Sequence, residues 1–137
     1  MVQNVYVPQR HLIDNLGGCA RDIYDFSIHG GAVGTIQMPL VVPDNSIITE
    51  CMVDVLTDPT SGGSATIALG LDTTTDLLAA TAIASVTGIV AAKAQAAAFK
   101  LTADRNLQLT IATAALTAGK LAVHLKWAGA YDDETSR

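Results

Sequence analysis

Aromatic and charged side chains are scarce in this chain of 137 residues. Only 4% of the residues are aromatic and 15% are charged, whereas an average soluble domain carries roughly 25% charged residues. Because half of the residues are hydrophobic, we expect other subunits to cover part of the outer surface. The length is typical of one domain and suffices for a hydrophobic core without metal or disulfide crosslinks.

Basic character is also missing. The formal net charge is −5 at pH 7, which provides no basic surface for neutralising phosphates or binding an anionic membrane. The most hydrophobic segment, "LLAATAIASVTGIVAA", contains Thr, Ser and Gly, and it is shorter than the roughly 20 residues that a spanning helix needs. We therefore expect neither nucleic acid nor a membrane as a partner.

Cysteine and targeting signals are sparse. The amino-terminal "MVQNVYVPQRHLIDNLGG" lacks the basic start, the apolar run and the cleavage site of a signal peptide. This predicts a protein that is made in the cytoplasm and stays there. Of the two cysteines, Cys51 falls on the apolar side of an alternating segment, so we expect a buried free thiol there and no disulfide to Cys19.

Motifs for catalysis or metal binding are absent from the sequence. His11, His29 and His124 lie far apart without zinc-ligand spacing, and His124 is predicted to point outward from its strand. The patterns G-x-S-x-G, Walker A and G-x-G-x-x-G do not occur. We therefore predict no enzyme activity, no catalytic residue and no cofactor.

The acidic pair Asp72 and Asp76 leaves two interpretations open. These carboxylates flank "TTT" and would suit a calcium ion, but the glycine and the later glutamate of an EF-hand loop are missing. A helix cap is the preferred interpretation. The segment that follows, "DLLAATAIA", has Leu77, Leu78, Thr81 and Ala82 at helical spacing, which predicts one short helix.

Alternating apolar residues predict about six short strands between residues 34 and 128. Pro39 within "TIQMPLVVP" indicates an edge strand or a bulge. "PDN" at 43–45, "DPTSGGS" at 58–64 and "TAGK" at 117–120 are predicted to be turns or loops. Because helical crossovers are missing, the pattern predicts an all-β fold: an antiparallel β-sandwich of jelly-roll or related Greek-key type, with one short helix and an N-terminal arm.

The alternation also predicts which side chains form the core. The inward set consists of fifteen residues from the predicted strands: Cys51, Val53, Val55, Ile67, Leu69, Leu71, Phe99, Leu101, Leu107, Leu109, Ile111, Leu121, Val123, Leu125 and Trp127. The outward face of the strand at 66–70 carries Thr66, Ala68 and Gly70. That face is predicted to be small and flat.

Three parts of the chain follow from this pattern: an arm at residues 1–29, a sandwich domain at 30–130 and a polar tail at 131–137. The arm has no regular period, apart from a short strand expected at Val5–Val7, yet it carries several large apolar side chains. Such side chains need a surface to pack against, either on the sandwich, on a sister subunit or on another partner. The predicted interface residues are Tyr6, Leu12, Ile13, Ile23, Tyr24 and Phe26.

The segments "SGGSATIALGLD", "LLAATAI" and "LTADRNLQLTIATAALTAGK" carry a resemblance to a known class of proteins. Over residues 30 to 128 the chain resembles small structural proteins encoded beside the major capsid protein of tailed bacteriophages, known as decoration, cement or head-fibre proteins. Similar β-sandwiches occur in tail and fibre proteins of the same viruses.

The resemblance implies a non-enzymatic virion protein that is assembled in the host cytoplasm. Its partner would be the major capsid protein, whose lattice it would bind on the outside and stabilise. A homotrimer at three-fold positions of the capsid would gain from multivalent binding, and a dimer is the alternative. The alternative function is a tail or fibre module that binds a host receptor or glycan.

Overall fold

The computed structural model describes residues 17–93 and 98–129. It contains nine strands, one short α-helix and one 3-10 turn within these ranges. Their bounds in chain order are β1 (Gly17–Asp25), α2 (Phe26–His29), β2 (Gly34–Val42), β3 (Ile47–Ser61), β4 (Thr66–Gly70), β5 (Leu78–Ala82), η2 (Ile83–Ser85), β6 (Ile89–Lys93), β7 (Phe99–Lys100), β8 (Arg105–Ala112) and β9 (Leu116–Ala128).

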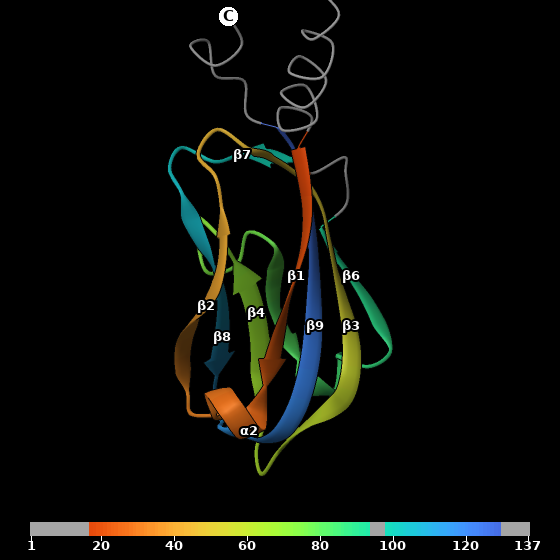
Figure 1. Cartoon of the computed structure of the whole chain (residues 1–137). Helices are drawn as coiled ribbons and strands as arrows, with labels where there is room; N and C mark the ends of the chain where they lie inside the picture. Colours follow the sequence, from red (N-terminus) through yellow and green to blue (C-terminus); the bar gives the residue numbers. More distant parts are fainter. Residues whose placement is uncertain (1–16, 94–97, 130–137) are drawn as a thin grey trace, which may run out of the picture.

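Two antiparallel sheets face each other across the core (Figure 1). Sheet A has the order β1-β9-β3-β6, and the short β7 also pairs with β3. Sheet B has the order β2-β8-β4-β5. The predicted all-β antiparallel sandwich with one short helix is therefore confirmed.

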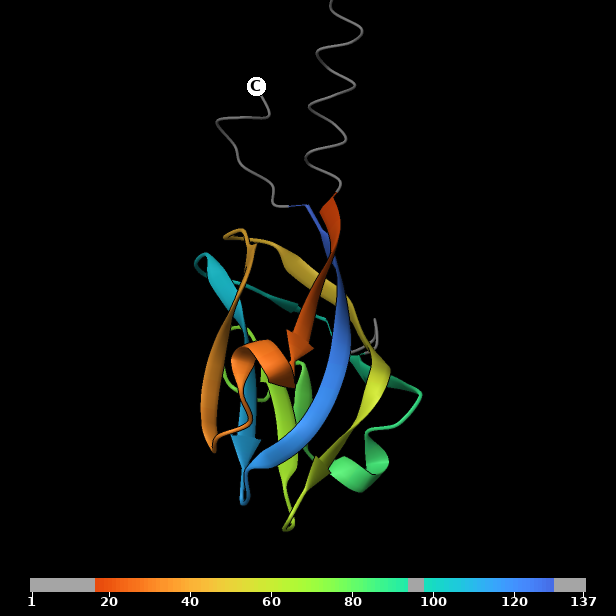
Figure 2. The ribbon, with the colours of Figure 1, turned by 60° about the horizontal axis from the view of Figure 1, so that its bottom comes forward.

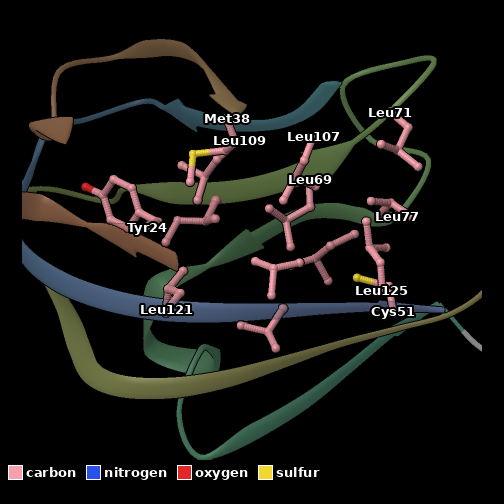
Figure 3. Packing of buried hydrophobic residues seen from close by; sticks show 14 of the residues in the cluster. Tyr24, Met38, Cys51, Leu69, Leu71, Leu77, Leu107, Leu109, Leu121 and Leu125 are labelled. Carbon is pink, nitrogen blue, oxygen red and sulfur yellow. The ribbon is translucent and has the colours of Figure 1, made fainter. Parts of the chain in front are cut away.

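The core between the sheets is built from the predicted inward side chains (Figure 3). Of the fifteen predicted residues, twelve are buried, and Val55, Phe99 and Trp127 are partly buried against them. Tyr24, Met38 and Leu77 are buried in addition. The predicted core is confirmed, because strict alternation in β8 and β9 leaves only one face for the apolar side chains.

Pro39 lies where the sequence predicts an edge strand or a bulge, and both descriptions are correct. β2 is the edge of sheet B, and its pairing with β8 shifts register between Gln37 and Val41. Side chains replace the missing ladder bonds: the Leu40 N–H donates to an Asp22 carboxylate oxygen at 3.0 Å, and the Asn106 amide donates to the Met38 carbonyl at 2.9 Å. Side chains from both sheets thus provide hydrogen-bond partners for the backbone groups of the bulge.

The short helix does not lie where the sequence predicted it. Residues 78–82 form the edge strand β5, in which Thr81 pairs with Ile67 and Leu78 pairs with Leu69 of β4. Both Leu77 and Leu78 are buried by this pairing. The prediction was wrong because an alanine-rich segment has no strong strand propensity of its own, and the available sheet edge decided its conformation.

Of the predicted turn segments, "TAGK" lies wholly in a strand, and "DPTSGGS" is strand up to Ser61 and loop after it. β3 continues through Pro59 to Ser61, and β9 begins at Leu116, so "TAGK" lies inside β9. Gly119 has φ 143°, and a Cβ there would stand 3.1 Å from the Pro59 Cα. Glycine thus gives Pro59 room in an irregular strand pair. The chain reverses earlier, around Thr113, which has φ 71°. The "PDN" turn is confirmed, with Asn45 at φ 64°.

The sheet begins before the predicted domain boundary at Gly30. β1 pairs with β9 along its whole length, from Gly17 opposite Ala128 to Asp25 opposite Lys120. Residues 17–29 are therefore a strand and a helix of the sandwich, a correction to the arm predicted at 1–29. The alternation of β1 was not recognised in the sequence because a polar residue, Asp22, occupies one of its inward positions and points toward β2. Residues 1–16 lie outside the described part of the chain, and so does the strand expected at Val5–Val7.

The two ends of the sandwich differ. The helix α2 lies at one end, and the first residue of β1 and the last residues of β9 lie side by side at the other (Figure 1). Figure 2 shows α2 folded across its own end of the sandwich, beside β2. Among the described residues, no helix has the length and apolar character needed to cross a membrane.

Candidate interaction surface

Tyr24, a predicted interface residue, belongs to the core of its own chain. Its side chain is 0% exposed, and its hydroxyl donates to the Gly30 carbonyl at 2.7 Å. Its ring stacks on His29 with centroids 5.7 Å apart. Burial, helped by the negative charge of Asp25, raises the pKa of the Tyr24 hydroxyl above its usual value. Tyr24 cannot anchor a partner, because no part of it reaches the surface.

The other predicted interface residues are divided between the surface and the undescribed segment. Phe26 is partly buried and packs against the core. Ile23 lies opposite Ala122 on the outer side of sheet A and is partly exposed. Tyr6, Leu12 and Ile13 lie outside the described residues and stay predictions.

The segment 26–33, which we call the α2 tip, is held firmly at both ends. Asp25 caps α2 by accepting hydrogen bonds from the Ser27 N–H at 2.9 Å and the Ser27 hydroxyl at 2.7 Å. Gly30 closes the helix at φ 77°, and its N–H donates to the Phe26 carbonyl. The Gly31 carbonyl then accepts from the Leu116 N–H at 2.8 Å. The tip is therefore a fixed projection of the sandwich.

The α2 tip presents two aliphatic side chains to solvent. Ile28 is 76% exposed and Val33 is 58% exposed, in contrast to the buried Tyr24. Neither residue was predicted as an interface residue. The available signal was the absence of charge: residues 26–43 contain no Asp, Glu, Lys or Arg. A charge-free segment at the surface is unusual, since charged residues normally cover solvated loops.

Charge is distributed unevenly between the sheets. In sheet B, Arg105 at the start of β8 is the only charged residue of the four strands. The strands of sheet A contain ten: Arg21, Asp22, Asp25, Glu50, Asp54, Asp58, Lys93, Lys100, Lys120 and Lys126. The two outer faces of the sandwich therefore offer different surfaces to a partner.

The outer face of sheet B, which we call the B face, is flat, polar and, apart from Arg105 and Asp104 at one end, uncharged. Across it, the hydroxyls of Thr35 and Thr110 lie 2.9 Å apart, and Gln37 lies opposite Gln108. Thr66 and Ala68 continue the row on β4, as the small flat face predicted from the sequence. A shallow depression of about 340 Å³ lies at one end of this face, where Arg105 pairs with Asp72 at 2.7 Å.

The outer face of sheet A is charged and mixed. A depression of about 320 Å³ is lined there by Cys19, Glu50, Met52, Asp54, Ile89, His124 and Lys126. Lys126 and Glu50 approach to 3.9 Å across it. His124 lies on this outer face, as its alternation predicted. Cys19 and Cys51 are not joined by a disulfide, and Cys51 is buried whereas Cys19 is exposed, which agrees with the sequence prediction.

The acidic pair Asp72 and Asp76 stabilises a loop. Asp76 accepts backbone hydrogen bonds from Leu71 at 2.7 Å and from Asp72 and Thr73 at 2.9 Å. The helix cap expected here was wrong, because the strand β5 follows Asp76 and no helix does; Asp76 instead closes the loop before β5. In the described ranges, no three His, Cys, Asp or Glu side chains gather as a metal site.

The serine-glycine segment at the end of β3 also has a structural role. The Ser61 hydroxyl donates to the Ala115 carbonyl at 2.6 Å and accepts from the Gly63 N–H at 3.1 Å. It thereby ties the β3–β4 loop to the turn before β9. No acid or base accompanies Ser61 in these contacts, so the hydroxyl is used for loop geometry.

Comparison with known proteins gives a likeness in fold. No protein-family profile and no curated protein matches the chain. Solved structures with a similar fold include three from phage capsids. A chain of the acidic stable capsid structure of Helicobacter pylori bacteriophage KHP30 has a TM-score of 0.61 and 10% identity, over 82% of this chain and 87% of that one.

The other two structures match over a similar extent. A chain of the capsid of Ralstonia phage GP4 has a TM-score of 0.59 and 23% identity, over 87% of this chain and 89% of that chain. A chain of the cyanophage Pam1 capsid asymmetric unit has a TM-score of 0.58 and 16% identity, over 82% and 85%. At these identities the likeness establishes that this chain shares its sandwich fold, nearly end to end, with chains found in phage capsid structures.

Proposed function

We propose that this protein is a structural component of a phage head. The observation that carries the proposal is the fold likeness to chains of three phage capsid structures, which covers at least 82% of this chain in each case. The strand order supports it. When the two-residue β7 is set aside, the order has the jelly-roll arrangement, which viral capsid domains use.

Within the head, the protein acts as a decoration or cement protein on the outside of the major capsid protein lattice. Cement proteins add contacts between neighbouring subunits, and this task needs a stiff scaffold with complementary surfaces and no reactive group. The fixed α2 tip and the uncharged B face are suited to such contacts. The protein is non-enzymatic in this proposal, and a homotrimer at three-fold positions gives the multivalency that weak contacts require.

Binding to capsids tests this function directly. Purified protein is mixed with capsids assembled without it, and the capsids are sedimented. We expect saturable co-sedimentation and release of packaged DNA at a higher temperature once the protein is bound. If the protein stays in the supernatant at all concentrations, the decoration function is wrong, and a tail or fibre module that binds a receptor or glycan becomes the better hypothesis.

A further inference from the structure

We infer that the α2 tip and the B face form the docking surface, and that they contact an uncharged area of the capsid protein lattice. This inference rests on the proposed function and assigns the side of the sandwich that faces the shell. Sheet A then faces solvent. The two docking elements are continuous, because β2 follows the tip directly and forms the edge of the B face.

Charge complementarity defines the partner surface. Residues 26–43 carry no charge, and Arg105, the one charged residue in the strands of sheet B, is already paired with Asp72. A charged partner group buried on this surface away from Arg105, Asp72 and Asp104 would lose its hydration and find no counter-ion. The surface therefore fits a partner area without charge. The strands of sheet A carry Lys, Asp and Glu side chains beside the exposed Ile47, Leu56 and Ile89.

The α2 tip has the properties of a preformed anchor. Asp25 caps its first turn, Tyr24 and Leu116 donate to the backbone carbonyls of Gly30 and Gly31, and Phe26 packs on the core. Ile28 and Val33 are nevertheless the most and third most exposed of the large apolar side chains of the described chain, at 76% and 58%. Binding such side chains costs little ordering entropy, because the backbone that carries them is already fixed.

Two matched substitutions test the assignment of the surface. Ile28→Asp places a charge on the tip, and Ile89→Asp places the same charge on β6 of sheet A, where Ile89 is 63% exposed. In the capsid co-sedimentation assay we expect Ile28→Asp to weaken binding by about tenfold or more, as for the loss of an interface anchor. We expect Ile89→Asp to bind like the unmodified protein. Unfolding curves of both variants confirm that they fold.

A third variant separates charge from shape on the B face. Gln37→Glu replaces an amide by a carboxylate of the same size at an exposed position of β2. We expect about a tenfold loss of capsid binding, since the carboxylate would lose its hydration when it is buried. The converse Glu50→Gln on sheet A should leave binding unchanged.

The outcomes distinguish the surface from the function. If unmodified protein binds capsids and Ile28→Asp binds equally well, the docking surface is wrong while the function stands. If Ile89→Asp alone loses binding, sheet A is the docking side. If Ile28→Asp instead abolishes self-association in light scattering and leaves capsid binding unchanged, the tip contacts a second copy of the chain, and the inference is overturned. Failure of the unmodified protein to bind contradicts the proposed function itself.

Discussion

The Tyr24 hydroxyl donates a hydrogen bond to the Gly30 carbonyl at 2.7 Å, which joins the end of strand β1 to the residue that ends α2. This bond crosses the whole helix and lies on the buried side of the tip. Tyr24 thus sets the position of the exposed Ile28 from within the core. This hydrogen bond therefore links a core residue to the proposed docking surface.

Tyr24→Phe removes this bond and keeps the ring in the core. The Gly30 carbonyl loses its donor, so we expect a loss of about 1–2 kcal/mol in unfolding free energy. Urea denaturation measures this loss, and amide exchange at Gly30 and Gly31 should increase by more than exchange in β8. Equal exchange in the tip and in β8 would show that the bond does not hold the tip.

Leu109→Ala and Gln108→Ala compare neighbouring residues on opposite faces of β8. Leu109 is 0% exposed, so its truncation should cost about 2–5 kcal/mol. Gln108 donates to the Leu71 carbonyl at 3.1 Å from the outer face, so its truncation should cost about 0.5–1.5 kcal/mol. Denaturant midpoints give the order, and a reversed order would contradict the assignment of the two faces.

The cap at Asp25 predicts a specific response to acid. Hydrogen bonds from the side chain and backbone of Ser27, followed by Lys120, lower the pKa of the Asp25 carboxyl below its ordinary value of 3.8. A lowered folded pKa gives stability that is present above the unfolded pKa and is lost as pH falls through the folded pKa. We expect the stability difference between the unmodified protein and Asp25→Asn to shrink as pH falls below about 4. A constant difference at every pH would show that the charge of Asp25 does not contribute.

Truncation separates the undescribed segment from the sandwich. Deleting residues 1–16 leaves β1 intact, so the protein should fold with an unchanged circular dichroism spectrum. Deleting residues 1–29 also removes Tyr24 and an edge strand, so it should unfold or aggregate. If Tyr6, Leu12 and Ile13 contribute to docking as predicted, the shorter deletion weakens capsid binding. Full binding without residues 1–16 would remove them from the interface.

The fold was predictable wherever the alternation was strict. Leu107, Leu109 and Ile111 on β8 and Leu121, Val123 and Leu125 on β9 gave the correct faces, because burial of one side requires period two. Breaker residues were less informative. Pro59 and Gly119 suggested a loop and a turn, whereas the structure places them side by side in adjacent strands. A single sequence does not show that Gly119 leaves room for Pro59 in the neighbouring strand.

The candidate surface was the hardest part to predict. The sequence drew attention to large apolar side chains in residues 1–29, and the largest of those described, Tyr24, is in the core. Ile28 and Val33 become a surface only because α2 turns back across the end of the sandwich (Figure 2). The charge-free segment 26–43 was visible from the start, but its meaning depends on which side of sheet B is solvated. The solvated side of sheet B can be identified only when the strand order is known.

A reconstruction of the intact virion by electron cryomicroscopy tests the central claim most directly. The account predicts density for this β-sandwich on the outer surface of the head, repeated over the capsid lattice, with the α2 end and sheet B toward the shell. Density for the protein at the tail, on the inner surface or nowhere in the virion would contradict it.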